Sequence, residues 1–144
     1  MKISISSDHA GFRYKELIKN YLTQKGYEIT DRGTYSEESV DYPDFIQKSA
    51  NDVAQHKVDF GIGICGSGIG VSISANKIKG VRAALVLNQE MASLSRQHNN
   101  ANFLALSQKF TDEKLLFAIV DTWLNTSFEG GRHQRRVDKL ELNS

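Results

Sequence analysis

The chain has 144 residues, of which 40% are hydrophobic and 24% charged, and its formal net charge is +1. This size and composition are typical of one globular domain over residues 1–144, and the near-neutral charge argues against nucleic acid as a partner. No apolar stretch reaches membrane-spanning length, and the apolar residues before Asp8 are too few for a signal peptide. A single cysteine excludes an internal disulfide, so we expect a cytoplasmic protein.

The first elements alternate between strand and helix. Residues 2–6 have the pattern of a short strand, and a polar turn at 7–11 follows. A helix is expected next, because apolar residues recur at the spacing of one helix face: Tyr14, Leu17, Ile18, Tyr21 and Leu22. Gly26 is suited to end this helix in a left-handed cap. Residues 27–30 then form a second strand, and 31–43 a polar loop.

The middle of the chain carries a second helix and a strand that is apolar on both faces. The expected inward side of the helix is Phe45, Ile46, Val53 and Ala54. The strand runs through residues 58–65, and its unbroken apolar character is typical of a central parallel strand. A glycine-rich turn at 66–70 then opens a helix over 71–77.

The second half continues this alternation. Residues 81–87 and 102–106 have strand patterns with a helix over 89–97 between them, and Thr111 precedes a strongly apolar helix. A basic C-terminal segment, residues 130–144, is expected to hold a short final helix. Five strands alternating with helices predict an α/β fold of the three-layer, Rossmann-like kind, with a five-stranded parallel sheet flanked by helices on both faces.

Cys65 stands where the third expected strand meets the glycine-rich turn. A thiol in this place meets unpaired N–H groups and the positive end of a helix dipole, which favour the thiolate. The glycines let backbone amides converge on an anion, either a phosphate or a developing oxyanion. Ligands of such sheets bind beyond the carboxyl ends of the strands, where Asp8 and His9 are also expected. A buried cysteine without chemistry is the alternative interpretation.

Three other kinds of site match the sequence only in part. Residues 61–66 fit G-x-G-x-x-G, but the first five lie inside the apolar strand, which disfavours nicotinamide binding. A cysteine phosphatase needs an arginine six residues after its thiol, and Val71 occupies that position. The histidines lack metal-ligand spacing, so the sequence predicts no metal site.

Two polar groups of residues remain. His98 lies where the helix over 89–97 should end, and it either complements the helix dipole or faces a ligand. Arg132 and Arg136 share one helix face at i, i+4 spacing, which suits a dianionic phosphate, although a solvated helix face is the common alternative.

Four segments taken together carry a family resemblance. They are residues 7–12 (SDHAGF), 65–70 (CGSGIG), 95–99 (SRQHN) and 129–137 (EGGRHQRRV). In this order they resemble ribose-5-phosphate isomerases of type B, in the family that also contains the galactose-6-phosphate isomerase subunits. The resemblance implies interconversion of ribose 5-phosphate and ribulose 5-phosphate, a phosphorylated sugar as substrate, and no metal or organic cofactor.

The resemblance also implies roles for individual residues. Cys65 matches the base that moves a proton between C1 and C2, and Ser67 matches a hydroxyl that assists at the sugar oxygens. His98, helped by Asp8, matches the group that opens the furanose ring. The further substrate-binding positions are Gly66, Gly68, Ile69 and Gly70 for the enediolate, Asn99 for a sugar hydroxyl, and His9, Arg132 and Arg136 for the sugar or phosphate.

One position departs from the family pattern. An arginine is expected shortly after the fifth strand, and this chain has Lys109, which keeps the charge but lacks the bidentate fork. Two alternatives to ribose 5-phosphate isomerisation remain: an isomerase of a six-carbon sugar phosphate (allose or galactose 6-phosphate), and a non-catalytic sugar-phosphate sensor. The presence of both a candidate base and a candidate ring-opening group argues against the sensor.

The order of the elements predicts a homodimer. His98 ends a helix that returns to the fifth strand, so it should lie at the amino edge of the sheet, whereas Cys65 lies at the carboxyl edge. One small domain cannot easily bring both to one pocket. We expect sites shared between subunits, in a dimer or a tetramer, and the dimers of the family agree with this.

Overall fold

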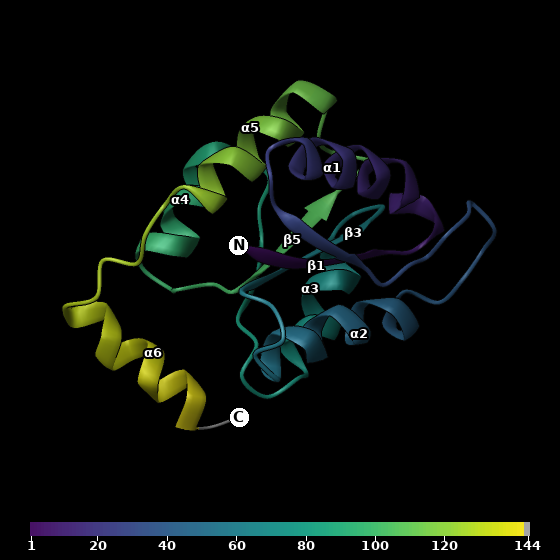
Figure 1. Ribbon diagram of the computed structural model, residues 1–144. Helices are drawn as coiled ribbons and strands as arrows, with labels where there is room; N and C mark the ends of the chain where they lie inside the picture. Colours follow the sequence, from purple (N-terminus) through teal and green to yellow (C-terminus); the bar gives the residue numbers. More distant parts are fainter. Residues whose placement is uncertain (143–144) are drawn as a thin grey trace.

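The computed structural model describes residues 1–142, so the last two residues of the basic C-terminal segment lie outside the described part. Its centre is a five-stranded sheet in which every pairing is parallel, with the order β2-β1-β3-β5-β4. The strands are β1 (Lys2–Ser7), β2 (Glu28–Asp31), β3 (Phe60–Cys65), β4 (Ala83–Leu85) and β5 (Phe103–Ser107). The predicted central position of β3 is confirmed, and β1 and β5 are its neighbours (Figure 1).

Helices cover both faces of this sheet (Figure 1). They are α1 (Phe12–Gln24), α2 (Tyr42–Ala54), α3 (Ile69–Asn76), α4 (Gln89–Gln97), α5 (Glu113–Leu124) and α6 (Arg132–Leu142), with a 3-10 turn at His9–Gly11. Side chains of α1, α4 and α5 share one buried cluster with the sheet, and those of α2 and α3 share a second. The three-layer α/β prediction is therefore confirmed. None of the described helices has the length and apolar character that crossing a membrane requires.

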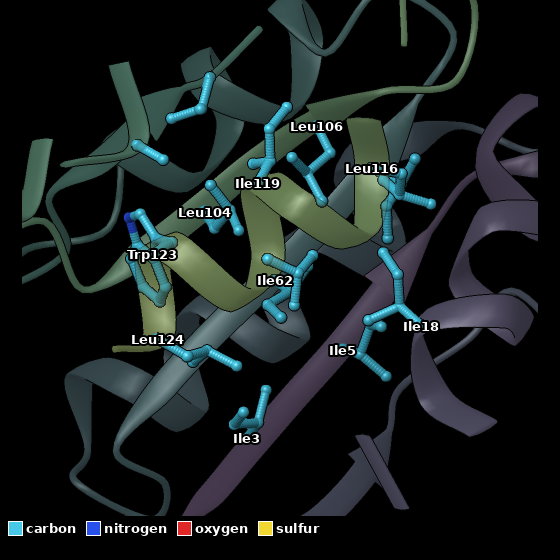
Figure 2. Close-up of a cluster of buried hydrophobic side chains, with 14 of the residues drawn as sticks. Ile3, Ile5, Ile18, Ile62, Leu104, Leu106, Leu116, Ile119, Trp123 and Leu124 are labelled. Carbon is cyan, nitrogen blue, oxygen red and sulfur yellow. The ribbon is translucent and has the colours of Figure 1, made fainter. Parts of the chain in front are cut away.

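The larger core lies between the sheet and the α1 and α5 helices. Figure 2 shows Ile5, Ile62 and Leu104 of neighbouring strands facing Ile18 of α1 and Ile119 of α5, all fully buried. Alternate residues of a strand point to the same face of a sheet, so the branched apolar side chains of these strands pack against the α1 and α5 helices. The indole of Trp123, also fully buried, donates a hydrogen bond to Ser95 Oγ at 3.1 Å and ties α5 to α4.

The opposite face explains the glycines of β3. A Cβ on Gly61 would lie 2.4 Å from the ring of Phe103, and one on Gly63 would lie 2.7 Å from Val71. These glycines make room for a bulky neighbour on β5 and for the close approach of α3. Two of the three glycines in the G-x-G-x-x-G match are therefore explained by packing around the strand.

Most element boundaries agree with the sequence pattern, and two differ. The fourth strand covers only Ala83–Leu85 rather than 81–87, because it is an edge strand paired on one side and Arg82 N–H is capped by the side chain of Asn102 at 2.7 Å. The final helix, expected to be short, runs over Arg132–Leu142, with Val137 as its one buried residue. Figure 1 shows α6 set apart from the layers that cover the sheet.

Candidate active site

The candidate site residues gather at two opposite edges of the sheet. At the carboxyl edge, Cys65 ends β3 and is 6% exposed. Its Sγ accepts a hydrogen bond from the Gly68 N–H at 3.1 Å, so the predicted contact between the thiol and an amide of the glycine-rich turn is present. An amide dipole directed at sulfur stabilises negative charge on it.

The turn after Cys65 is held by bonds from the end of β5. The carbonyl of Gly66 accepts hydrogen bonds from Ser107 Oγ at 2.7 Å and from Lys109 N at 2.9 Å. Gly68 has a φ of +80°, a conformation that suits glycine. Within the turn Ser67 Oγ accepts from Ile69 N at 3.2 Å. The backbone amides of this segment are thus fixed before any ligand arrives.

Residues that follow β1 lie beside this turn. Asp8 N donates to Ile64 O at 3.3 Å, and the Asp8 carboxylate accepts from Gly11 N at 3.1 Å. Gly11 has no room for a side chain, because a Cβ there would lie 2.4 Å from Ile64 O. His9 Nδ1 accepts from Val40 N at 3.2 Å, which leaves the proton of the neutral ring on Nε2.

Lys109 also belongs to this edge. It lies two residues after the end of β5, its N–H donates to Gly66 O, and its side chain is exposed. Its Nζ lies 5.4 Å from the centre of the Phe110 ring. A cationic residue therefore lies next to the glycine-rich turn.

The remaining predicted residues lie at the amino edge. His98 is the C-cap of α4, with its N–H bonded to Leu94 O at 2.9 Å, and Asn99 follows. Cys65 pairs with Ser107 at the far end of β5. The length of that strand, about 13 Å at about 3.3 Å per residue, therefore separates the two groups. In the described part of the chain, Cys65 and Asp8 therefore lie at the opposite edge of the sheet from His98.

At the amino edge α6 completes a cavity of about 350 Å³ beside His98. Its lining is His98, Asn99, His133, Arg136, Val137 and Leu140. Arg132 is exposed on the same helix but does not line this cavity. Of the two arginines predicted to contact the sugar or phosphate, Arg136 is therefore the one that lines the cavity beside His98.

Sequence reasoning missed two neighbours of His98. The rings of His98 and His133 are stacked, with centres 4.3 Å apart and planes 13° apart, and Glu129 Oε1 lies 3.6 Å from His98 Nε2. Burial and the positive charges of His98 and Arg132 lower the pKa of His133. Both neighbours belong to the segment 129–137, which carried the resemblance, but their spacing from His98 gave no sign of contact.

A parallel sheet covered on both faces, with a thiol held at a glycine-rich turn, defines an α/β protein suited to a small anionic ligand. A family model described as Ribose/Galactose Isomerase matches residues 3–140. Ribose-5-phosphate isomerase B of Escherichia coli is 45% identical over 139 residues, covering 96% of this chain and 93% of that protein.

Solved structures agree with this match. The ribose-5-phosphate isomerase B of Clostridium thermocellum has a TM-score of 0.98 and 50% identity, over 99% of this chain and 97% of that one. The same enzyme of Mycoplasma genitalium, solved with bound ribulose 5-phosphate, has a TM-score of 0.95 and 46% identity, over 99% and 95% of the two chains. The chain belongs to the ribose/galactose isomerase family.

Proposed function

We propose that this chain interconverts ribose 5-phosphate and ribulose 5-phosphate. The observation that carries the proposal is the thiol of Cys65 at the end of β3, hydrogen-bonded to the Gly68 amide of the glycine-rich turn. A base and an amide cluster in one place are what proton transfer next to a carbonyl requires. Support also comes from the Mycoplasma genitalium relative, whose structure holds ribulose 5-phosphate.

In this mechanism Cys65 takes the proton from C2 of the open-chain aldose and returns it to C1, while a proton passes from O2 to O1. The amides of residues 66–70 stabilise the negative oxygen of the enediolate between these steps. Ser67 lies in the same turn, and its hydroxyl assists the transfer between the sugar oxygens.

Ring opening needs a group that both accepts and donates protons near neutral pH, which a histidine does. We assign this step to His98, with Asn99 binding a sugar hydroxyl. Asp8 supports His98 from the other edge. In this proposal His9, Arg132 and Arg136 contact the sugar or the phosphate, and Lys109 is a further substrate contact. No metal or organic cofactor takes part in these steps.

The two edges supply complementary halves of this machinery. We therefore propose a homodimer in which the carboxyl edge of one subunit meets the amino edge of its partner, so that each site combines Cys65 with His98 of the partner subunit. Isologous pairing of this kind gives two equal sites, and a tetramer would be two such dimers.

Purified protein incubated with ribose 5-phosphate and a chelator tests the reaction. We expect ribulose 5-phosphate to form, and turnover to fall by at least about a hundredfold in Cys65→Ala, since general-base catalysis contributes about 10²–10⁴. The matched control His56→Asn, at an exposed position outside the site, should keep full turnover. Calorimetry should show that Cys65→Ala still binds the sugar phosphate.

Allose 6-phosphate and galactose 6-phosphate run in parallel as the six-carbon alternatives. Turnover of either in place of ribose 5-phosphate would move the assignment to a hexose phosphate. Binding without turnover of any of the three sugars would favour the sensor, and substantial turnover by Cys65→Ala would show that another group is the base.

A further inference from the structure

Three side chains with metal-binding atoms meet at the amino edge of the sheet. They are His98, Glu129 and His133, and their ligand atoms lie within 4.8 Å of one another. They come from the end of α4, the loop after α5 and the first turn of α6. Two imidazoles and one carboxylate form the donor set of several catalytic zinc sites, which leave a fourth position open.

Backbone hydrogen bonds fix the three positions relative to one another. His98 N donates to Leu94 O at 2.9 Å, and Glu129 N donates to Gln97 O at 3.1 Å, which ties the loop to the end of α4. His133 N donates to Gly130 O at 3.0 Å. Gly130 has a φ of +70° and Gly131 a φ of +55°. The turn that they form brings Glu129 and His133 to the side of the chain that faces His98.

The side chains have room to close on an ion. Zn²⁺ with bonds of about 2.0–2.1 Å holds tetrahedral ligand atoms about 3.4 Å apart, less than the largest separation here. The His98 and His133 rings are stacked 4.3 Å apart, so one ring must turn out of the stack before both can direct a nitrogen at one ion. The His98 and Glu129 side chains are 40% and 49% exposed, which leaves them free to make this movement. The cavity of about 350 Å³ that His98 and His133 line leaves space beside them for a fourth ligand.

We propose that His98, Glu129 and His133 form a binding site for Zn²⁺. The bound ion engages the His98 imidazole, which is then not available for ring opening, and so inhibits the enzyme. Imidazole and carboxylate ligands suit Zn²⁺ better than Mg²⁺ or Ca²⁺, which prefer oxygen alone. Arg132 and Arg136 on the same helix oppose a cation, so the ion is held reversibly and a chelator removes it. Binding depends on the three ligands alone, whereas inhibition rests on the proposed role of His98.

Metal titration of the full chain tests binding without measuring activity. We expect one Co²⁺ per chain with the intense visible bands of tetrahedral Co²⁺, displaced by one Zn²⁺. Glu129→Gln and His133→Asn each remove one ligand and should weaken binding by at least about tenfold, while His56→Asn should bind like the wild type. Equal affinity in all these variants would overturn the site.

The wild-type protein provides a second readout that does not depend on a variant folding. The chain has four histidines. On addition of Zn²⁺ the ring NMR signals of His98 and His133 should shift, and those of His9 and His56 should not. Shifts confined to the signals of His9 and His56 would also overturn the site.

The inhibitory consequence has its own test. Saturating Zn²⁺ should lower turnover of ribose 5-phosphate at least tenfold, with full recovery after chelation. Turnover that is unaffected by a bound ion would disprove the inhibition while leaving the metal site in place. A chain that binds the ion but turns over no sugar even with chelator present would count against the proposed function instead.

Discussion

Gly68 serves the candidate site through both its conformation and its amide. Its φ is +80°, its N–H donates to Cys65 Sγ, and a Cβ would lie 2.5 Å from Leu85 Cδ1 and 3.0 Å from Leu106 O. We predict that Gly68→Ala lowers the free energy of unfolding by about 2–4 kcal/mol, from backbone strain and overpacking together. Because the amide then moves away from the thiol, turnover should fall as well. Denaturant unfolding and a turnover assay measure the two effects.

The matched control at this scale is Gly80→Ala. Gly80 has a φ of +90°, but a Cβ there meets nothing within 4 Å. This variant therefore carries only the conformational cost, about 1 kcal/mol, and should keep full turnover. Equal losses of stability in the two variants would mean that the packing around Gly68 relaxes freely and that the turn is not rigid.

At the scale of elements, a buried ion pair joins α1 to the end of β2. Lys15 Nζ is fully buried and lies 2.6 Å from Asp31, whose carboxylate also accepts from Gly33 N at 2.9 Å. Burial raises the pKa of Asp31, but hydrogen bonds from Lys15, Gly33 and Lys19 outweigh it, so this pKa lies below its usual value. The pair helps to hold the start of the loop that runs on to Val40, whose N–H donates to His9 Nδ1.

We predict that Asp31→Asn lowers the free energy of unfolding at pH 7 by about 3 kcal/mol, because it leaves a buried ammonium without its main partner. A lowered carboxyl pKa stabilises the fold above the unfolded value of about 3.9, and this contribution disappears as pH falls through the folded value. The gap between wild type and variant should therefore be constant from pH 7 to about pH 5 and narrow below about pH 4.

Denaturant unfolding at several pH values measures this gap. Glu113→Gln is the control, because it breaks the ion pair with Arg13, in which both side chains are about half exposed. That change should cost no more than about 1 kcal/mol. A gap for Asp31→Asn that stays constant down to pH 3 would show that its cost is not electrostatic.

Local patterns predicted the elements well and the contacts of α6 poorly. The spacing of apolar residues predicted α1 with Ile18 and Leu22 on its buried face, and the apolar run before Cys65 predicted a central strand. Both patterns reflect burial against the adjacent layer. The meeting of His98 with His133 depends on how α6 sits against the end of α4. That placement follows from the turn at 130–131 and from single contacts such as Arg82 with Glu141 at 2.5 Å, which no periodicity encodes.

At the scale of the whole molecule, the separation of Cys65 from His98 makes a shared site testable. Mixing Cys65→Ala and His98→Ala chains and letting them exchange should give half mixed dimers. Each mixed dimer has one site with both groups intact and one with neither, so we predict recovery of about a quarter of wild-type turnover. Each variant alone should stay inactive.

The control mixture is Cys65→Ala with Cys65→Ser, which exchanges in the same way but leaves every site without its thiol. Differently tagged chains and native mass spectrometry establish that mixed dimers have formed. Recovery in the first mixture alone requires that the two edges of the sheet meet across the dimer. Inactive mixed dimers would disprove the shared site, because Cys65 of one chain and His98 of its partner would then not act together.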